Sequence, residues 1–333
     1  MNRFVISALL LVASVAASAQ TKLNGAGATF PYPIYSKWFA EYNKLHPDVQ
    51  INYQSIGSGG GIRQVSTGTV DFGASDGPMT DQQLSDAKTK IVHIPTVLGA
   101  VVPAYNIAEV KQELNFSGPT LAKIFLGQIN NWNDPAIAKD NPGVSFPNKN
   151  IVVVRRSDGS GTTYCFTDYL SKVSQDWAQG PGKGTAVKWP TGIGAKGNEG
   201  VAGMLRQMDG AIGYVELIYA EQNHIAYGKV KNAAGEFVKA SLDSVSKAAA
   251  TAKIPNDYRV SITNAPGKGV YPISTFTWLL IPQKNADANK QKIIVDFLNW
   301  MVNDGQKMTQ QLTYAPLPAE VATRVKATIS QLK

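Results

Sequence analysis

The chain has 333 residues, of which 44% are hydrophobic and 17% charged, and it carries a formal net charge of +8. This length is enough for two domains, and the composition is typical of a globular protein with a large core. The positive charge raises a nucleic-acid hypothesis, but Lys and Arg are scattered and the longest basic run is Arg155-Arg156. The sequence contains no zinc-finger, KH or RRM signature. We therefore expect no nucleic-acid partner.

Residues 1–19 are predicted to be a signal peptide. They contain a positive charge at Arg3, an apolar run over residues 4–15 and the small residues Ala17-Ser18-Ala19. The apolar run is shorter than the ~20 residues that a membrane-spanning helix needs, which favours cleavage near Ala19 over a permanent anchor. No cysteine stands directly after this site as a lipid acceptor. The mature protein is therefore expected to be exported.

Hydrophobic periodicity predicts alternating strands and helices along the rest of the chain. In chain order the predicted elements are helix 32–45, strand 49–53, a short helix through Ile62 and Val65, a strand and loop over 71–76, helix 81–88, strand 151–154, helix 164–170, helix 201–208, and helices 290–301 and 319–332. The order strand, glycine-rich loop and helix occurs three times. Such alternation favours an α/β fold with mainly parallel sheets.

Two apolar runs that contain prolines, 94–106 and 270–281, bear on domain organisation. Each could be a pair of core strands, or could carry the chain from one domain to another, because proline stiffens a crossover. Two crossings imply a discontinuous first domain. The sequence therefore predicts domain I over 20–105 and 273–333, and domain II over 106–272.

Four segments rich in Gly, Ser and Thr are candidate binding loops: 25–30, 57–61, 73–77 and 159–163. Three lie between a predicted strand and a predicted helix, and the first lies just before a helix. A helix N-terminus presents unpaired N–H groups and the positive end of its dipole, so such loops favour an oxyanion. Any single loop could be only an N-cap and a tight turn. Together with the planar cation of Arg156, which Asp158 could hold in place, they predict an anion site.

Two further motifs compete with this interpretation. Residues 73–77 fit the G-x-S-x-G elbow of hydrolases, so Ser75 or Ser160 could be a nucleophile, but no histidine is close to either in sequence. Residues 192–197 match G-x-G-x-x-G, but Pro190 interrupts the preceding segment, which favours a plain glycine-rich loop leading to helix 201–208. The P-loop motif of NTP-binding proteins is missing.

The cysteine and histidine content indicates neither a disulfide nor a metal site. Cys165 is the single cysteine, so it cannot form an internal disulfide and is expected to be a buried, unreactive thiol. The three histidines, at positions 46, 93 and 224, lack zinc-site spacing. We expect no metal and no cofactor.

Four motifs in order, GAGATFPYPIY, SIGSGGGIRQ, TVDFGASDGP and VVVRRSDGSGTT, resemble the phosphate-binding protein of bacterial phosphate-specific ABC transporters, the PstS family. The resemblance continues through LGQINNWNDPAIAKDNPG, WPTGIGAKGNEGVAG and IGYVE, and covers nearly all of residues 22–333. It implies a two-domain periplasmic binding protein of type II, with a two-strand hinge and the ligand in the interdomain cleft. It also implies a non-catalytic monomer that binds inorganic phosphate in the periplasm and delivers it to a membrane permease.

The resemblance also assigns the binding residues. The implied phosphate ligands are Thr29, Phe30, Ser58 and Asp76 from the first domain and Arg156, Ser160, Gly161 and Thr162 from the second, with Asp158 pairing with Arg156.

Asp76 is the acceptor in this set. Monohydrogen phosphate has an O–H that can donate to a carboxylate, whereas sulfate at neutral pH has none, so such a site can discriminate by roughly 10⁴–10⁵. A secreted serine hydrolase and a receptor for another tetrahedral oxyanion, sulfate or molybdate, remain the alternatives.

Overall fold

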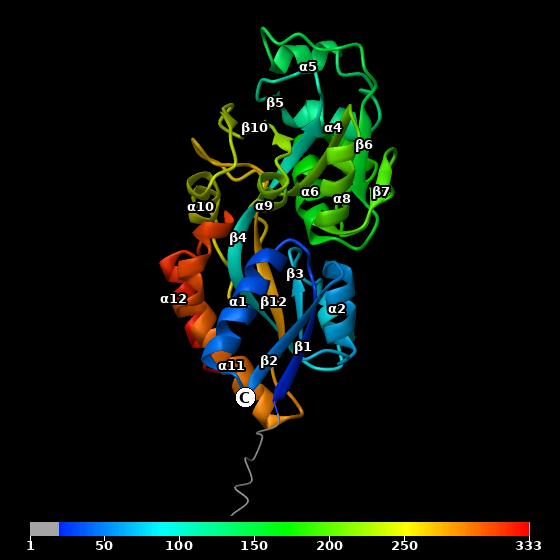
Figure 1. The fold of residues 1–333 in the computed structure, drawn as a ribbon. Helices are drawn as coiled ribbons and strands as arrows, with labels where there is room; N and C mark the ends of the chain where they lie inside the picture. The colour runs from blue at the N-terminus through cyan, green and yellow to red at the C-terminus, as the bar shows by residue number, and fades with distance from the viewer. Residues whose placement is uncertain (1–19, 333) are drawn as a thin grey trace, which may run out of the picture.

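The computed structural model describes residues 20–332, so the predicted signal peptide lies outside the described residues. The molecule has two lobes, one above the other in Figure 1. A sheet of nine strands runs through both lobes in the order β2-β1-β3-β12-β4-β8-β6-β7, and β9 pairs with β4 outside this path. The predicted α/β fold is confirmed, but the expectation of mainly parallel sheets is wrong, because antiparallel pairs of β12 and β4 make up half of the strand pairs in this sheet.

Lobe I is built on the β2-β1-β3-β12 part of the sheet. Its strands are β1 (Thr21–Gly27), β2 (Val49–Ser55), β3 (Phe72–Ser75), the first part of β4 (Ile91–Asn106) and β12 (Ser274–Pro282). Its helices are α1 (Tyr32–Leu45), α2 (Ser58–Ser66), α3 (Asp81–Asp86), α11 (Ala288–Asn303) and α12 (Ala319–Ile329), with 3-10 turns at Gly305–Met308 and Gln310–Leu312. β1 is parallel to both β2 and β3, whereas β12 is antiparallel to β3 and β4.

Lobe II contains the rest of β4 and the chain that follows it. Its strands are β6 (Val152–Arg156), β7 (Ile193–Ala195), β8 (Ala211–Glu216) and β9 (Ala226–Tyr227), with a second, three-stranded sheet of β5 (Asn115–Phe116), β10 (Lys229–Lys231) and β11 (Phe237–Val238). Its helices are α4 (Gly118–Phe125), α5 (Pro135–Asp140), α6 (Gly161–Val173), α7 (Gln175–Gln179), α8 (Gly197–Gln207) and α9 (Leu217–Gln222). Helix α10 (Leu242–Ala250) contacts β4 and β12 at the junction of the lobes.

Helix α1 illustrates how the sequence pattern produces the fold. Its buried side chains are Ile34, Tyr35, Trp38, Phe39 and Tyr42, which recur every three or four residues and so form one apolar stripe. The helix ends one residue before His46-Pro47, where proline cannot continue it. The stripe packs on the sheet and against α11, and α1 has the bounds that the sequence predicts.

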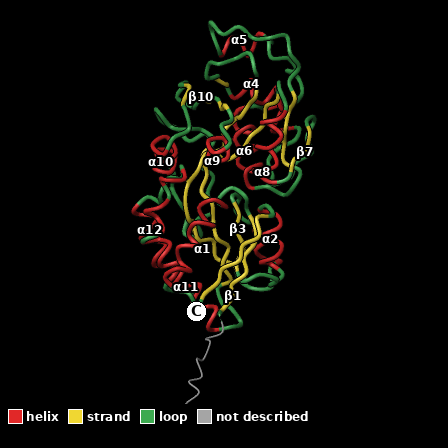
Figure 2. The backbone as a smooth tube through the Cα atoms, viewed as in Figure 1, coloured by secondary structure: helices red, strands yellow, loops and turns green. Residues whose placement is uncertain are grey.

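The chain crosses between the lobes within one long strand. β4 has 16 residues and pairs with β12 as far as Ala100, then with β8 from Val101 onward. Figure 2 shows this strand running through the junction of the lobes. The returning segment lies beside it, because Val101 N–H donates to Ile273 O at 2.9 Å and Tyr271 O–H donates to Val101 O at 2.9 Å. These two adjacent crossings form the two-strand hinge of the predicted fold class.

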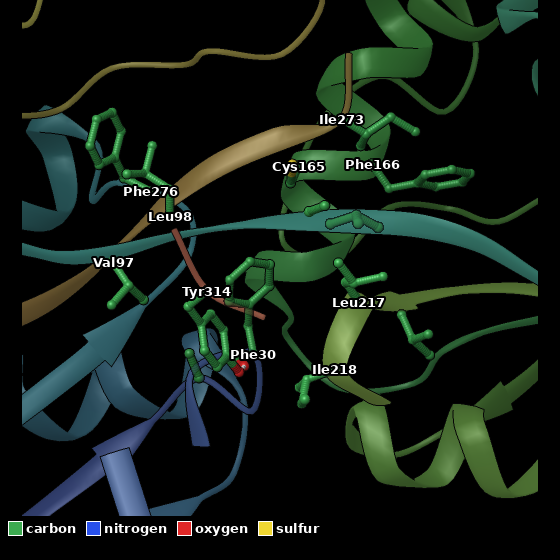
Figure 3. Packing of buried hydrophobic residues seen from close by; sticks show 14 of the residues in the cluster. Phe30, Val97, Leu98, Cys165, Phe166, Leu217, Ile218, Ile273, Phe276 and Tyr314 are labelled. Carbon is green, nitrogen blue, oxygen red and sulfur yellow. Dashed lines mark hydrogen bonds between the residues drawn. The ribbon is translucent and has the colours of Figure 1, made fainter. Parts of the chain in front are cut away.

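Apolar side chains from both lobes fill the space around these crossings (Figure 3). Phe30 and Tyr314 from lobe I lie near Leu217 and Ile218 from lobe II, and all four are buried. A Cβ on Gly99 would stand 2.6 Å from the Phe30 ring, so a side chain on β4 would collide with the ring here. The junction is therefore a continuous part of the hydrophobic core.

Two local features differ from the sequence-based expectations. Residues 193–195 form strand β7, parallel to β6, although this segment was expected to be a loop. Strand β3 includes Gly73 and Ala74, which the sequence places in a candidate binding loop, because strands β1 and β12 pair with it on either side. The segment 254–259 contacts lobe I: Tyr258 O accepts a hydrogen bond from Trp278, and Arg259 pairs with Asp81.

Within residues 20–332, no helix combines the length and apolar character needed to cross a membrane.

Candidate functional site

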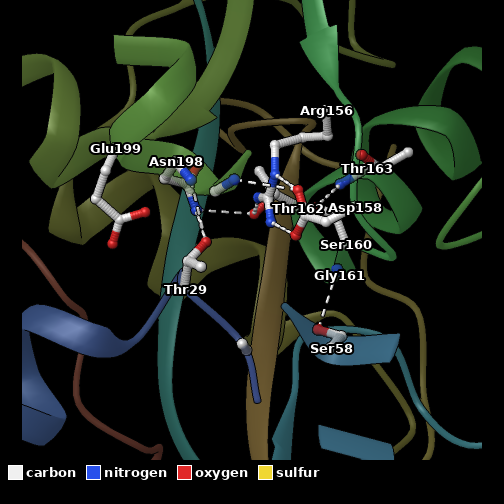
Figure 4. Close-up of polar contacts among 12 residues, drawn as sticks. Thr29, Ser58, Arg156, Asp158, Ser160, Gly161, Thr162, Thr163, Asn198 and Glu199 are labelled. Carbon is white, nitrogen blue, oxygen red and sulfur yellow. Dashed lines mark hydrogen bonds and ion pairs between the residues drawn. The ribbon is translucent and has the colours of Figure 1, made fainter. Parts of the chain in front are cut away.

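The predicted binding loops meet at the junction of the lobes, on the side where helices α2 and α6 begin (Figure 4). Ser58 is the first residue of α2, and Ser160 is the N-cap of α6. The Ser160 hydroxyl accepts the N–H of Thr163 at 3.0 Å, which fixes the first turn of the 13-residue helix α6. Two helix N-termini from different lobes therefore face one small space, and both favour negative charge there.

Ser58 joins the two lobes through its hydroxyl oxygen. This oxygen accepts the backbone N–H of Asp76 at 3.2 Å and that of Gly161, from lobe II, at 3.0 Å. Close by, Gly59 N–H donates to Gly159 O across the junction at 2.9 Å. Ser58 is fully buried, and its oxygen has used both lone pairs as an acceptor, so its own hydrogen can only be donated, to the neighbouring Asp76 carboxyl group or to a ligand.

Arg156 is held by Asp158, as the sequence predicts. Its Nε donates to Asp158 Oδ1 at 2.8 Å, and its Nη2 forms an ion pair with Asp158 Oδ2. The Arg156 side chain is buried. Burial alone would raise the pKa of Asp158, but the hydrogen bonds and charge of Arg156 outweigh it, and the pKa is lowered. The pair is thus ionised, with the remaining Nη1 directed at the Thr162 hydroxyl at 3.4 Å.

Asp76, on the lobe I side of the site, has a different environment from that of Asp158. It is buried, and its Oδ1 accepts a hydrogen bond from the Thr277 hydroxyl at 2.9 Å. Burial raises its pKa to about 7, only partly offset by the hydrogen bond from Thr277 and the charge of Arg156. A Cβ on Gly161 would lie 2.5 Å from Asp76 Oδ2, so the start of α6 can approach this carboxyl group only because residue 161 is glycine.

Thr29 and Phe30 enter the site from the loop between β1 and α1. The Thr29 hydroxyl oxygen accepts two hydrogen bonds from Asn198, one from the backbone N–H at 3.2 Å and one from Nδ2 at 2.8 Å. Its carbonyl accepts the Tyr219 hydroxyl at 2.6 Å, another contact between the lobes. The Phe30 carbonyl accepts the Tyr314 hydroxyl at 2.6 Å. All the predicted site residues therefore gather around one junction.

The sequence-based reasoning missed three polar residues at this junction: Thr277, Asn198 and Tyr219. Thr277 directly precedes an irregularity in the β4–β12 register, between Thr277 and Trp278, which no sequence pattern predicts. Asn198 lies at the start of α8, after the glycine-rich segment 192–197. That segment is rich in glycine and leads into a predicted helix, as the other binding loops do, and this was the available signal.

The structure does not assemble the hydrolase alternative. Ser75 O–H donates to Gly77 O, and Ser160 accepts from Thr163. Among residues 20–332, which include all three histidines, no histidine is hydrogen-bonded to either serine. His93 Nε2 instead accepts the N–H of Met79 at 3.1 Å, and burial lowers the pKa of this histidine to about 4.

Residues 20–332 likewise contain no cluster of metal-ligating side chains and no exposed thiol. In the described part of the chain, no group of three or more His, Cys, Asp or Glu side chains could hold a metal ion. Cys165 is buried, and burial raises the pKa of its thiol well above the usual value. A thiol in this environment stays protonated and unreactive, as the sequence predicts.

Comparison with known proteins identifies the family. Residues 14–305 match the model of the PBP superfamily domain. The phosphate-binding protein PstS of Xylella fastidiosa is 47% identical over 309 residues, covering 92% of this chain and 84% of that protein. PstS of Haemophilus influenzae is 46% identical over 308 residues, with 92% and 91% covered. The chain belongs to the PstS family. The resemblance inferred from the sequence motifs is confirmed.

Solved structures support the fold of this PstS relative. A high-affinity periplasmic phosphate-binding protein, PfluDING, solved with bound phosphate, superposes with a TM-score of 0.74 at 23% identity, covering 92% of this chain and 93% of that chain. The phosphate-binding protein of Stenotrophomonas maltophilia gives a TM-score of 0.71 at 20% identity, with 92% and 94% covered. At these identities the likeness establishes a shared fold.

Proposed function

We propose that this protein binds one inorganic phosphate ion between its lobes and delivers it to the membrane permease of a phosphate ABC transporter. It acts in the periplasm as a monomer, after removal of residues 1–19, and catalyses no reaction. The proposed ligands are the residues that the sequence assigned: Thr29, Phe30, Ser58, Asp76, Arg156, Ser160, Gly161 and Thr162. Asp158 supports Arg156.

The observation that carries this proposal is that groups which favour an anion lie beside a buried carboxyl group at the junction. Two helix N-termini, a buried arginine and several hydroxyl groups favour an anion. A buried carboxyl group, Asp76, shares the same space. A bound anion that still carries a proton satisfies both features, since its O–H can donate to Asp76 while its other oxygens accept. Monohydrogen phosphate has this pattern, whereas sulfate lacks the proton.

We propose that ligand binding is coupled to closure of the two predicted domains. The first comprises residues 20–105 and 273–333, and the second comprises residues 106–272. The change of strand partner at Ala100–Val101 supports a hinge near the first boundary. The contacts of segment 254–259 with lobe I suggest that this part of the second predicted domain moves with the first. Contacts such as Tyr219 to Thr29 form only when the lobes are together.

The test is calorimetric titration of the mature chain, 20–333, after phosphate has been removed by unfolding and refolding in phosphate-free buffer. Phosphate is titrated at neutral pH, followed by sulfate in a separate experiment. We expect tight one-to-one binding of phosphate and no heat with sulfate. Absence of heat with phosphate would contradict the proposal, and equal affinity for sulfate would remove the proton-reading role of Asp76.

A further inference from the structure

Asn198 occupies a central position at the junction of the lobes. It is fully buried and lies at the start of α8 in lobe II. Its side chain contacts Thr29 of lobe I, Thr162 of lobe II and the backbone of Glu216 at the end of β8. Figure 4 shows the amide pointing at the two threonines. Asn198 is outside the set of proposed phosphate ligands.

The orientation of the amide follows from its backbone partner. The N–H of Glu216 lies 3.0 Å from the side-chain oxygen of Asn198. A backbone N–H can only donate, so the atom that faces it has to be the oxygen Oδ1. The nitrogen Nδ2 therefore faces the two threonine hydroxyls, at 2.8 Å from Thr29 and 3.1 Å from Thr162. An amide nitrogen can only donate, so both threonine oxygens are acceptors in these bonds.

These hydrogen bonds determine whether the two threonine hydroxyls can donate to a ligand or accept from it. The Thr29 oxygen accepts from the backbone N–H and from Nδ2 of Asn198, and the Thr162 oxygen accepts from Nδ2 and from Arg156. A hydroxyl has two lone pairs and one hydrogen, so both oxygens have no acceptor capacity left. Within residues 20–332, neither hydroxyl donates to another protein group. Each hydrogen therefore remains for a ligand.

We propose that Asn198 is a positioning residue that commits the Thr29 and Thr162 hydroxyls to donate to the bound anion. It also joins the lobes through the same side chain, because Thr29 and Thr162 belong to different lobes. The inference rests on the proposed phosphate function and adds a residue that acts through the ligands without touching the phosphate. A threonine that was free to rotate could present a lone pair to phosphate, which would repel it.

The decisive variant is Asn198→Asp, which keeps the shape of the side chain and reverses its polarity. One carboxylate oxygen still accepts from Glu216, but the other accepts the threonine hydrogens, which are then lost to the ligand. We expect at least about 100-fold weaker phosphate binding at pH 7.5, measured by calorimetry with inorganic phosphate. The loss relative to the unmodified protein should shrink toward pH 5, because a protonated carboxyl group can donate again.

A matched control is Asn141→Asp. Asn141 is also buried, accepts the N–H of Asn115 through Oδ1 and donates Nδ2 to Asn115 O and Ile137 O, all within lobe II. This variant carries the same chemical change and tests the effect of a buried charge on the fold. Its phosphate affinity should stay within about threefold of the unmodified protein at every pH.

A double-mutant cycle tests the inference without the introduced charge, and remains decisive if Asn198→Asp does not fold. Asn198→Ala and the pair Thr29→Val with Thr162→Val are measured separately and together. If Asn198 acts through the two hydroxyls, the combined variant binds phosphate about as weakly as the threonine variant alone. Fold-losses that multiply would overturn the inference, as would phosphate binding by Asn198→Asp within threefold of the unmodified protein. Failure of the unmodified protein to bind phosphate would instead overturn the proposed function.

Discussion

The two faces of the site each carry one aspartate, buried in the case of Asp76 and half-buried in the case of Asp158, and the two carboxyl groups behave in opposite ways. Asp158, in lobe II, is paired with Arg156 through two contacts, and its pKa is lowered. Asp76, in lobe I, has a hydroxyl partner instead of a cation, and its pKa is raised to about 7. Asp158 positions the positive charge of Arg156, whereas Asp76 is a hydrogen-bond acceptor that gains a proton near pH 7. Residue type alone therefore does not define their roles.

The largest expected effect is a change in the preference for phosphate over sulfate, which distinguishes the role of Asp76 from that of Asp158. Asp76→Asn should reduce the preference for phosphate over sulfate by up to about 10⁴-fold, since the amide can donate to a sulfate oxygen that the carboxylate repels. Asp158→Asn should weaken the binding of phosphate and of sulfate by similar factors, because it disturbs Arg156 and leaves Asp76 in place. Competition binding of the two anions gives the ratio. An unchanged ratio in Asp76→Asn would mean that the two aspartates do not differ in this way.

The next effect concerns the cation of lobe II. Arg156→Ala should weaken phosphate binding by about 10²–10³-fold, because it removes a buried positive charge and leaves Asp158 unpaired beside the ligand. Arg155→Ala is the control, since its Nη1 donates to the backbone oxygen of Arg156, at 3.3 Å, and not to a residue of the proposed ligand set through its side chain. Calorimetry with phosphate measures both. Similar losses in the two variants would indicate a general effect of positive charge.

A third prediction uses the pH dependence of stability without ligand. The raised pKa of Asp76 means that its contribution to folding is fully present below the unfolded pKa of about 3.9 and is lost as pH rises through about 7. The loss is at most about 4 kcal/mol in the free energy of unfolding. Urea unfolding in phosphate-free buffer should show this decline between pH 4.5 and 8, and Asp76→Asn should flatten it. Parallel curves for the two proteins would contradict the raised pKa.

Asp158 gives the opposite dependence, because its pKa is lowered in the folded state. Its contribution is present above the unfolded pKa and is lost as pH falls through the folded value. Asp158→Asn should therefore alter stability mainly at neutral pH, which the same urea experiment records.

The smallest effect tests a contact that joins the two faces. Tyr219→Phe removes the hydroxyl that donates to Thr29 O and should weaken phosphate binding by about 3- to 10-fold, the size of one hydrogen bond. Tyr227→Phe is the control, because the hydroxyl of Tyr227 bonds to Glu221 within lobe II. A similar affinity in both variants would show that Tyr219 does not favour the closed arrangement.

Local patterns in the sequence were enough to predict many helices and several strands of this fold. The stripe of α1 and the N-cap of α6 at Ser160 depend on residues close together in the chain. The loops that carry Thr29, Ser58 and Arg156 were predicted for the same reason, since each lies beside a helix start or a strand end. The family motifs then assigned individual ligands, and those assignments stay predictions.

Contacts between distant segments could not be predicted from local patterns. Thr277 reaches Asp76 across 201 positions of sequence, and Asn198 reaches Thr29 across 169. The register irregularity between β4 and β12 and the parallel pairing of β7 with β6 both depend on how the sheet assembles. The raised pKa of Asp76 is likewise a product of burial, which the sequence DFGASDG does not reveal.

The continuity of β4 has a mechanical consequence. A strand of 16 residues spans roughly 50 Å at ~3.3 Å per residue, and its change of partner lies after Ala100, closer to the C-terminal end of the strand. It therefore acts as a lever with two unequal arms, of about 30 Å and about 18 Å, and a rotation of about 10° at this point moves the end of the longer arm by about 5 Å. A rearrangement of the size of one ion at the centre thus becomes a displacement at the outer ends, where distance probes attached to the two lobes would register it.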